Sequence, residues 1–375
     1  MKFHELPTPC YVVDEKRLIH NLEILQGIMK RTGCHILLAQ KAFAMFSVYP
    51  LVKSYLSGTT ASGLYEAKLG FEEMGLENHI FSPAYREDEF EEICKLCGHI
   101  VFNSFSQLKK YKDIAMKNGV SIGIRVNPEC STQEGHEIYD PCASGSRLGV
   151  TLKNFQPEQL DGVEGIHFHT LCEQDADALL TTLDAVEDKF GPYLKNMKWI
   201  NFGGGHHITK NGYDIASLEK AIKRIQKTYD VTVYIEPGEA IAYHAGYLVT
   251  SVLEIIENDL AIGILDTSAA CHMPDVLEMP YRPPLKDAGR PGEKDYTYRL
   301  AGPTCLAGDV IGDYSFQSPL AVGERLIFED MAIYSMVKNN TFNGMPLPAI
   351  AIQKTDGQCE IVKQFGYKDF KMRLS

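Results

Sequence analysis

The stretch Ile36-Leu37-Leu38-Ala39-Gln40-Lys41-Ala42-Phe43 decides how the rest of the chain is interpreted. Its apolar run contains no turn residue and predicts a short buried strand. The strand ends at Lys41, and lysine is seldom fully buried without a partner. Lys41 is therefore either the first solvated residue after the strand or a lysine that forms a Schiff base, a role that desolvation of its amine favours. This stretch alone leaves both interpretations open.

The same alternation of short β-rich runs and helix-like segments continues through the first two thirds of the chain. It is typical of parallel βα units, and eight such units within 375 residues predict a closed (β/α)8 TIM-like barrel, placed at residues 20–255. Helical patterns between the runs include Leu64–Glu73, Ser106–Lys117, Ala176–Phe190 and Ile215–Tyr229. The predicted strands are His35–Lys41, Gly58–Ser62, His79–Pro83, His99–Asn103, Ser121–Asn127, Gly165–Thr170, Trp199–Gly203 and Val231–Glu236.

A second domain follows the predicted barrel. After about residue 255 the helical periodicity weakens and Gly and Pro cluster between short apolar runs. The runs Arg325–Phe328, Leu347–Ile352 and Cys359–Val362 predict strands, and Thr8–Val13 is expected to join them. Residues 1–19 and 256–375 are therefore predicted to form a mostly antiparallel β domain.

Composition narrows the class of protein. The hydrophobic fraction of 45% and the charged fraction of 23% are ordinary for a globular protein. The net charge of -12 argues against a nucleic-acid partner or an anionic membrane surface, and it fits a cationic substrate. Met1–Pro7 contains no apolar signal core and no run is long enough to span a bilayer, so a cytoplasmic protein is expected.

The ten cysteines are scattered, which favours thiols over disulfides. Cys94-Lys95-Leu96-Cys97 is a CxxC within a helical pattern, but no second CxxC completes a zinc site. We therefore interpret this pair as structural.

Chemically distinctive residues stand at the ends of several predicted strands. The C-terminal ends of barrel strands converge at one mouth, where active sites of this fold are built. Each feature alone has an ordinary explanation, such as a βα turn or a strand with one solvent-exposed face, but their convergence indicates an active site. These residues are Lys41, Arg125, His167, His169, Gly203-Gly204-Gly205 and Glu236-Pro237-Gly238-Glu239.

Together these side chains match the needs of one cofactor. The glycine run lets backbone amides approach an anion, and this part of a barrel often binds phosphate. His169 suits stacking on a flat ring, and Glu236 suits pairing with a ring nitrogen. With Lys41 they describe pyridoxal 5'-phosphate, or PLP. His167 and His169 also share a strand face, but no third ligand has suitable spacing, so no metal is predicted.

Cys305 lies in Gly302-Pro303-Thr304-Cys305-Leu306-Ala307-Gly308-Asp309, within the second predicted domain. A thiol in a Gly-Pro turn is either an exposed reactive group or a core filler, and the sequence leaves both open. The same domain contains Asp330-Met331-Ala332-Ile333-Tyr334.

Together these stretches resemble a known family, and the resemblance extends over nearly the whole chain. It is similar to the fold-type III PLP-dependent decarboxylases, which join an alanine-racemase-like barrel to a β domain, and among them to the carboxynorspermidine/carboxyspermidine decarboxylases. The stretches that carry the resemblance are Leu38–Phe43, Ser62–Lys68, Val101–Ser104, Phe168–Thr170, Phe202–Gly205, Glu236–Ala240, His272–Glu278, Gly302–Cys305 and Tyr334.

Two departures separate the chain from better-known relatives. Ornithine and arginine decarboxylases of this fold usually place arginine after Glu-Pro-Gly, where this chain has Glu239. Diaminopimelate decarboxylases usually follow the active-site cysteine with glutamate, and ornithine decarboxylases with aspartate, whereas Leu306 stands here. These differences argue against all three specificities and remove a familiar phosphate ligand.

The resemblance implies a role for each residue. Lys41 would carry PLP, Glu236 would keep the ring nitrogen protonated, His169 would stack on the ring, and either Lys41 or Cys305 would return a proton after CO2 leaves. Gly203, Gly204, Gly205, Gly238, Tyr334 and Arg125 would complete the cofactor site. Glu239, Asp275 and Asp309 would read the amines of the polyamine precursor.

The implied reaction converts carboxynorspermidine or carboxyspermidine to norspermidine or spermidine and CO2. In the family the cysteine loop reaches the partner's site, so a homodimer with shared active sites is expected. Two other classes of protein fit the sequence less well. A PLP-binding barrel for cofactor homeostasis usually lacks the β domain, and a non-catalytic regulator lacks the lysine or the cysteine.

Overall fold

The structure, a computed structural model, describes residues 1–133 and 137–375. It divides into two compact units. One unit is Asn21–Ile241, and the other combines Met1–His20 with Ala242–Ser375.

The unit Asn21–Ile241 contains a closed barrel of eight parallel strands, which confirms the predicted fold class. The circle closes where β9 pairs with β2, through His35 with Tyr234 and Ile36 with Ile235. Each predicted run overlaps one of these strands in the predicted order. The strands are β2 (His35–Ala39), β3 (Gly58–Ala61), β4 (Glu77–Phe81), β5 (His99–Phe102), β6 (Ser121–Arg125), β7 (Gly165–His167), β8 (Trp199–Asn201) and β9 (Thr232–Ile235).

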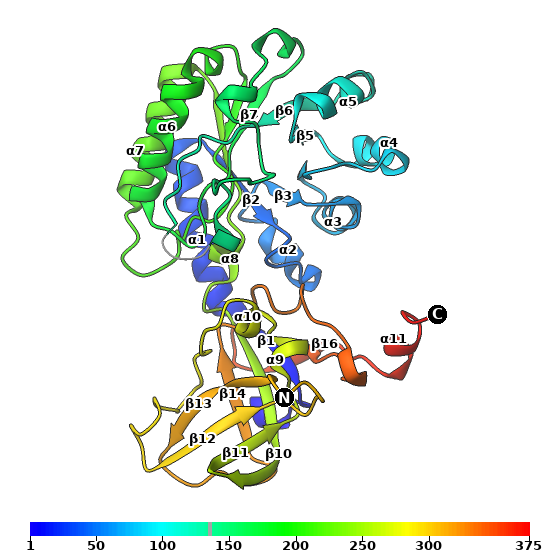
Figure 1. The fold of residues 1–375 in the computed structure, drawn as a ribbon, viewed down its shortest axis with the longest axis vertical. Coiled ribbons are helices and arrows are strands. Elements are labelled where there is room, and N and C mark those ends of the chain that lie inside the picture. Colours follow the sequence, from blue (N-terminus) through cyan, green and yellow to red (C-terminus); the bar gives the residue numbers. More distant parts are fainter. Residues whose placement is uncertain (134–136) are drawn as a thin grey trace. The chain divides into compact units, whose positions relative to one another are not determined.

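Helices lie around the outside of these strands (Figure 1). Their inward faces are apolar at helical spacing, as with Leu218, Ile222 and Ile225 of α7. Side chains cap two of them, since Ser104 accepts from the Gln107 amide and Asp214 from the Ser217 amide. The helices are α1 (Glu15–Thr32), α2 (Tyr49–Val52), α3 (Leu64–Leu69), α4 (Glu87–Leu96), α5 (Phe105–Lys117), α6 (Ala176–Leu194), α7 (Ile215–Tyr229) and α8 (Glu239–Ala242).

The predicted helix Leu64–Glu73 differs in its second half. The α-helix ends at Leu69, and Gly70–Met74 form a π-helical turn. A Cβ on Gly70 would lie only 2.4 Å from Oγ1 of Thr59. The turn therefore accommodates a close approach of the helix to the barrel wall, which helical periodicity cannot reveal.

The indole of Trp199 lies inside the barrel. A Cβ on Gly123 or Gly165 would lie 2.3 Å or 2.1 Å from the indole ring. Two neighbouring strands thus carry glycine where the largest side chain crosses the barrel. Leu37, Val101 and Tyr234 complete this buried cluster.

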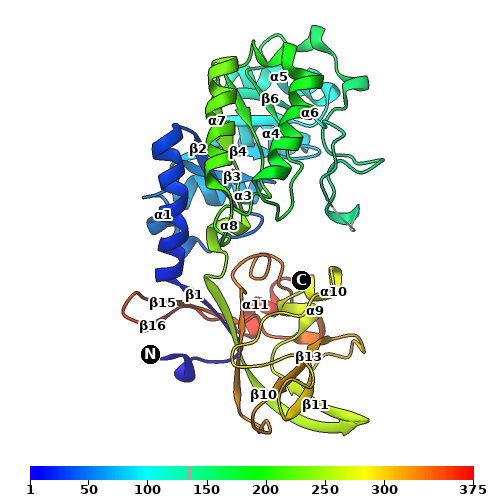
Figure 2. The ribbon, with the colours of Figure 1, turned by 90° about the vertical axis from the view of Figure 1, so that its left-hand side faces the viewer.

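The unit formed by Met1–His20 and Ala242–Ser375 is a mostly antiparallel sheet, as predicted (Figure 2). Its longest strand, β10, pairs through its first half with β1 and β14 and through its second half with β11. Only β1–β15 and β11–β12 pair in parallel among the described strands of this sheet. The strands are β1 (Cys10–Asp14), β10 (Gly246–Asn258), β11 (Leu260–Leu265), β12 (Tyr296–Ala301), β13 (Val310–Phe316), β14 (Arg325–Glu329), β15 (Ala349–Gln353) and β16 (Cys359–Lys363).

Strand β10 runs across residue 255, where the sequence predicted the domain boundary. Short helices α9 (Ala269–His272), α10 (Asp275–Glu278) and α11 (Tyr367–Lys371) complete this unit. Among the residues described, no helix is both long and apolar enough to cross a membrane.

Candidate active site

Lys41 lies two residues beyond the end of β2, at the C-terminal end of the barrel. The residue is accessible to solvent, yet protein surrounds its ammonium group closely enough for desolvation to lower its pKa. The positive charge of Arg125 lowers this pKa further, and Glu236 opposes the effect. An accessible amine with a lowered pKa is suited to Schiff-base formation.

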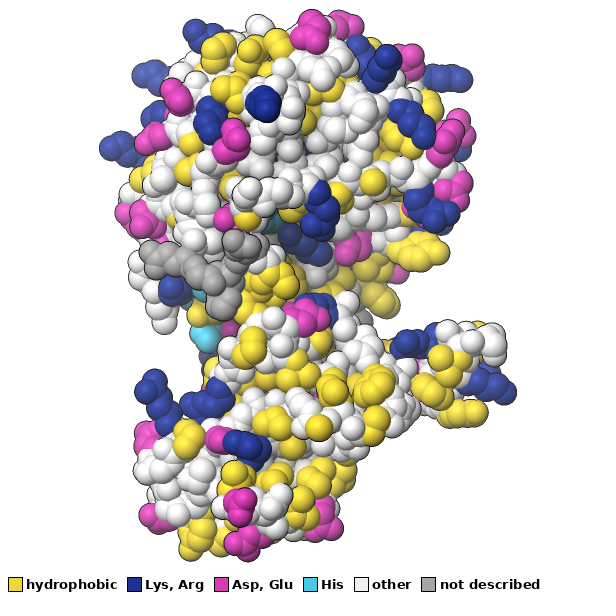
Figure 3. Space-filling model, viewed as in Figure 1, with side chains coloured by type: hydrophobic (Ala, Val, Ile, Leu, Met, Phe, Trp, Pro, Cys, Tyr) yellow, Lys and Arg dark blue, Asp and Glu magenta, His cyan; other side chains and the backbone are white. Residues whose placement is uncertain are grey.

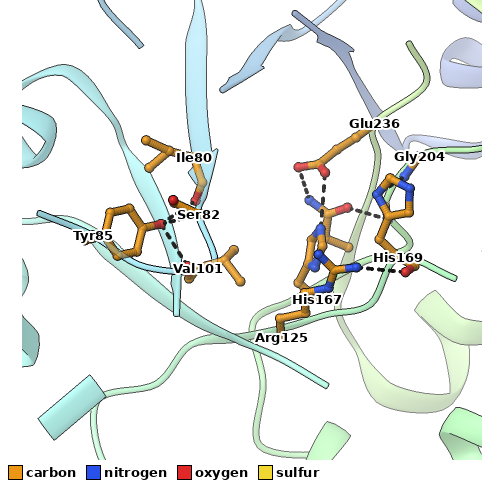
Figure 4. Close-up of polar contacts among 11 residues, drawn as sticks. Ile80, Ser82, Tyr85, Val101, Arg125, His167, His169, Gly204 and Glu236 are labelled. Carbon is orange, nitrogen blue, oxygen red and sulfur yellow. Dashed lines mark hydrogen bonds and ion pairs between the residues drawn. The ribbon is translucent and has the colours of Figure 1, made fainter. Parts of the chain in front are cut away.

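Glu236 follows β9 and is buried beside two hydrogen-bond donors (Figure 4). Its Oε1 accepts from Nδ2 of Asn201 at 2.8 Å, and its Oε2 lies 3.2 Å from Nε2 of His167. Burial alone would raise the pKa of Glu236, but its interactions with His167, which include a hydrogen bond, and the hydrogen bond from Asn201 outweigh burial and lower the pKa to about 2. The barrel mouth therefore holds an ionised carboxylate in a fixed orientation.

Both histidines of the HxH pair are held as neutral rings. Burial lowers the pKa of His167, and burial with the nearby charges of Lys41 and Arg125 lowers that of His169 well below its usual value. Nδ1 of His169 accepts from the Gly204 amide at 3.3 Å. Nη2 of Arg125 donates to the His169 carbonyl at 3.0 Å, so Arg125 supports the backbone beside the ring.

The glycine loop between β8 and α7 packs too closely on its neighbours for side chains. A Cβ on Gly204 would lie 2.5 Å from the Glu236 carbonyl oxygen and 3.1 Å from Cε1 of His169. Gly203 and Gly205 have φ values of +70° and +82°, which disfavour other residues. On the next loop, a Cβ on Gly238 would lie 2.6 Å from that of Ala42. Bare backbone after two adjacent strands fits a phosphate cradle.

Glu239 has a partner that the sequence did not reveal. Its Oε1 lies 3.3 Å from Nε2 of His207, and the two side chains are 15% and 9% exposed. His207 comes two residues after the glycine run, so the pair links the loops that follow β8 and β9.

The remaining predicted site residues belong to the other unit. Cys305 is exposed and is therefore not a core filler, and its amide donates to Oδ1 of Asn343 at 2.7 Å. Tyr334 lies in the left-handed region with φ +48°. Asp275 begins α10 and pairs with Lys338, whose ammonium also contacts Glu278.

Asp309 is buried and orders the segment that carries Cys305. It accepts from Oγ of Ser268 at 3.0 Å, from the Ala270 amide at 3.2 Å and from Oγ1 of Thr304 at 2.7 Å. Asp309 thus ties the segment of Cys305 to the start of α9, and its predicted contact with the substrate stays a prediction.

The described residues include one cluster with metal-ligand chemistry, Glu77, His79 and His99, at the opposite end of the barrel from Lys41. His79 and His99 are stacked, with ring centroids 4.0 Å apart and planes 24° from parallel. An ion in the plane of one ring would therefore lie out of the plane of the other. As they stand, the rings form a stacked pair beside a carboxylate that is hydrogen-bonded to His35 at 2.7 Å.

The structure thus brings Lys41, Arg125, His169, Gly203, Gly204, Gly205, Glu236, Gly238 and Glu239 together in one unit. Sequence reasoning missed two contributors, Asn201 and His207. Asn201 was open to discovery because it is a polar residue within the predicted strand Trp199–Gly203. His207 had no comparable signal, since its importance comes from a residue that lies far along the chain.

Comparisons with known proteins agree with this arrangement. Residues 10–332 match the family described as pyridoxal-dependent decarboxylase, C-terminal sheet domain. A carboxynorspermidine/carboxyspermidine decarboxylase of Campylobacter jejuni is 44% identical over 100% of both chains. A carboxyaminopropylagmatine decarboxylase of Synechocystis is 42% identical over 100% of this chain and 97% of that protein.

Solved structures of decarboxylases share the fold of this chain. Campylobacter jejuni carboxynorspermidine decarboxylase, crystallised with norspermidine, aligns with a TM-score of 0.93 at 42% identity, over 98% of this chain and 100% of that chain. Diaminopimelate decarboxylase of Helicobacter pylori shares the fold, with a TM-score of 0.83 at 19% identity. The chain therefore belongs to the pyridoxal-dependent decarboxylases and, among them, to the carboxynorspermidine/carboxyspermidine decarboxylase family.

Proposed function

We propose that this chain is a PLP-dependent carboxy-lyase that removes CO2 from carboxynorspermidine or carboxyspermidine. The products would be norspermidine or spermidine, as part of polyamine biosynthesis. The observation that carries the proposal is the grouping of Lys41, an ionised Glu236 and a neutral His169 at one barrel mouth. Full-length relatives with this named activity support the substrate class.

PLP, when bound, supplies an electron sink for the electron pair left as CO2 departs. Lys41 is the residue proposed to hold it covalently. Because the pKa of Glu236 is lowered, its carboxylate stays ionised and can keep a proton on a ring nitrogen. His169 is neutral, so it can stack on a protonated ring without repelling it.

The phosphate of the cofactor is assigned to the backbone of Gly203, Gly204, Gly205 and Gly238, with Tyr334 as an additional contact. Arg125 supports this site through the His169 carbonyl. Lys41 and Cys305 both remain candidates for the group that returns the proton. Each can carry a transferable proton, and each is accessible to solvent.

We further propose a homodimer in which Cys305 serves the partner's site. Leu306 follows Cys305 and is 44% exposed. Phe342 precedes Asn343, which accepts from the Cys305 amide, and is 48% exposed. Apolar side chains around an exposed thiol favour a surface that a second copy covers. Tyr367 and Met372, at 74% exposed each, add apolar surface on and beside α11, where hydrophobic side chains gather next to Lys and Arg (Figure 3).

A cytoplasmic location is part of the same proposal. All ten cysteines are free thiols, which fits a reducing compartment.

The carboxylates predicted to bind the cationic substrate differ in how directly they are proposed to contact it. Asp275 and Glu278 share one ammonium, that of Lys338, so this cluster keeps a net charge of about -1 for a substrate amine. Asp309 is proposed to act indirectly, by holding the Cys305 loop. Glu239 already has a cationic partner in His207, so a direct contact with the substrate is not assigned to it.

A second candidate substrate is carboxyaminopropylagmatine, because the Synechocystis relative bears that name at 42% identity. The deciding experiment compares kcat/KM for all three carboxylated polyamines, with CO2 release and the amine product both measured. We expect carboxynorspermidine or carboxyspermidine to be preferred by about tenfold or more, equivalent to roughly 1.4 kcal/mol. A higher value for carboxyaminopropylagmatine would establish the second candidate, and no CO2 from any of them would refute the proposed function.

A further inference from the structure

The contact between Glu239 and His207 joins the two loops of the barrel where phosphate is commonly bound. His207 lies on the loop after β8, and Glu239 opens α8 after β9; these are the seventh and eighth barrel strands. The ring nitrogen and the carboxylate oxygen are 3.3 Å apart in a largely buried setting. The contact thus crosses between the two stretches of bare backbone proposed as the phosphate cradle.

The backbone holds His207 close to that cradle. The Gln174 amide donates to the Gly205 carbonyl at 3.0 Å, and the His207 amide donates to the Gln174 carbonyl at 3.0 Å. Gln174 therefore clamps both ends of the short segment from Gly205 to His207. Two residues of chain span at most about 7 Å, so His207 cannot move far from the glycines.

A phosphate site here needs a positive charge. A phosphate monoester carries roughly -1.5 to -2 charges at neutral pH, and an unpaired Glu239 would repel it. Arg125 is committed to the His169 carbonyl and lies 4.5 Å from the ring centroid of Phe81. The Lys210 side chain is 44% exposed, and its Nζ lies 3.8 Å from Oδ2 of Asp175. Compared with these two described cations, His207 lies close to the glycine run, two residues after Gly205, and its contact with Glu239 links that run to the loop of Gly238.

We propose that His207, held by Glu239, supplies the positive charge and an N–H donor to the phosphate of the cofactor. Glu239 is then a positioning residue that acts through His207, in place of reading the substrate directly. An imidazolium has two N–H donors, and one faces Glu239. The proposal rests on the PLP-dependent function proposed above.

The electrostatic surroundings agree with a charged His207. Burial acts to lower the pKa of His207, but the hydrogen bond and negative charge of Glu239 outweigh it, and the pKa is raised. Glu173 raises this pKa further, whereas Lys210 opposes it. The pairing with Glu239 therefore stabilises the positive form of His207 relative to that of a free imidazole.

The experiment compares PLP with pyridoxal, which lacks the phosphate. Apoprotein is prepared from the full chain, and dissociation constants for both compounds are measured by absorbance for wild type, His207→Gln, Glu239→Gln and Lys210→Met. Loss of one charge-assisted contact should weaken PLP binding by about ten- to a hundredfold in His207→Gln, with pyridoxal binding unchanged. Lys210→Met, which removes a nearby exposed cation, should leave both constants close to those of wild type.

The pH dependence gives a second readout. The preference of wild type for PLP over pyridoxal should fall as pH rises through the pKa of His207, because the positive charge is lost. Taking the ratio of the two constants cancels the titration of Lys41, which affects both compounds. In His207→Gln this fall should be absent.

The role proposed for His207 can be refuted by the binding constants of the variants. Equal weakening of PLP and pyridoxal in His207→Gln, or no weakening, overturns the proposal. If His207→Gln does not fold, Glu239→Gln carries the test: it should weaken PLP binding, and a raised substrate KM with normal PLP affinity would show that Glu239 reads the substrate. Failure of wild type to bind PLP at all would instead refute the proposed function.

Discussion

Nε2 of His167 lies 3.2 Å from Oε2 of Glu236, and both side chains are buried in the barrel mouth. His167 comes from β7 and Glu236 from the end of β9, with Asn201 of β8 between them. Three adjacent strands thus fix one carboxylate. Because the ring is neutral and donates its N–H, the negative charge of Glu236 remains available to a ring nitrogen of the cofactor.

Removing that charge should damage catalysis more than cofactor binding. Glu236→Gln keeps the size of the side chain but cannot stabilise a protonated ring nitrogen. We expect kcat to fall by about 10²–10³-fold, as when other preorganised electrostatic groups are removed. Bound PLP, measured after alkaline release, should stay near one per chain. Wild-type kcat in Glu236→Gln would contradict this role.

Filling the glycine loop should weaken cofactor binding. The Cβ of Gly204→Ala would meet the Glu236 carbonyl at 2.5 Å, so the loop must shift. Gly98→Ala is the matched control, because nothing lies within 4 Å of the position that its Cβ would take. Titration of apoprotein with PLP should give a larger dissociation constant for Gly204→Ala alone. Equal constants for both variants would show that this loop does not shape the cofactor site.

The other end of the barrel should show its own pH dependence. Nδ1 of His35 lies 2.7 Å from Oε1 of Glu77, and this hydrogen bond raises the pKa of His35. Burial opposes ionisation of Glu77, but hydrogen bonds from His35 and His79 outweigh it and lower the pKa of Glu77. The raised pKa of His35 stabilises the fold fully below about pH 6.5, and this contribution is lost as pH rises through the folded-state pKa.

The stabilisation contributed by Glu77 depends on pH in the opposite direction. Its contribution is present above about pH 4.3 and is lost as pH falls. The Tm difference between wild type and His35→Gln should therefore be largest between about pH 4.3 and 6.5 and shrink on either side. His20→Gln, at an exposed histidine, is the control. A Tm difference that does not change with pH would mean that the pair does not stabilise the barrel electrostatically.

A shared active site predicts complementation between inactive variants. Lys41→Ala and Cys305→Ala should each lack activity as homodimers. Mixed under conditions that allow subunit exchange, they should form heterodimers in which one site keeps both residues. Each variant mixed with itself serves as the control. If CO2 release does not recover although exchange is shown by mass, Cys305 does not serve the partner's site.

Much of the fold could be predicted because hydrophobic pattern and barrel topology agree. The run beginning at His79 was nonetheless predicted two residues too late, since β4 starts at Glu77. A charged residue opening a barrel strand is unexpected from pattern alone, and here His35 and His79 provide its partners. The π-helical turn after Leu69 was missed for a similar reason, because it depends on Thr59 in another element.

In the candidate site, too, the features set by local sequence could be predicted, and those set by contacts between distant residues could not. Lys41, His169 and Glu236 could be predicted as candidate site residues because each lies near the end of a strand, and strand ends share one mouth in this fold. The contact of Glu239 with His207 was not found, because the residues are far apart in sequence and only the adjacency of β8 and β9 brings them together. The sequence predicts that Glu239 contacts a cationic substrate, and the structure places His207 of the same chain beside it.

Lys41 is proposed to carry PLP for the decarboxylation of a carboxylated triamine. The most direct measurement is release of CO2 from carboxynorspermidine by wild type and Lys41→Ala, together with borohydride reduction and peptide mapping of the PLP adduct. We expect stoichiometric CO2 and norspermidine from wild type, an adduct on Lys41, and neither activity nor adduct in Lys41→Ala. An adduct on another lysine, or CO2 release that survives Lys41→Ala, would contradict it.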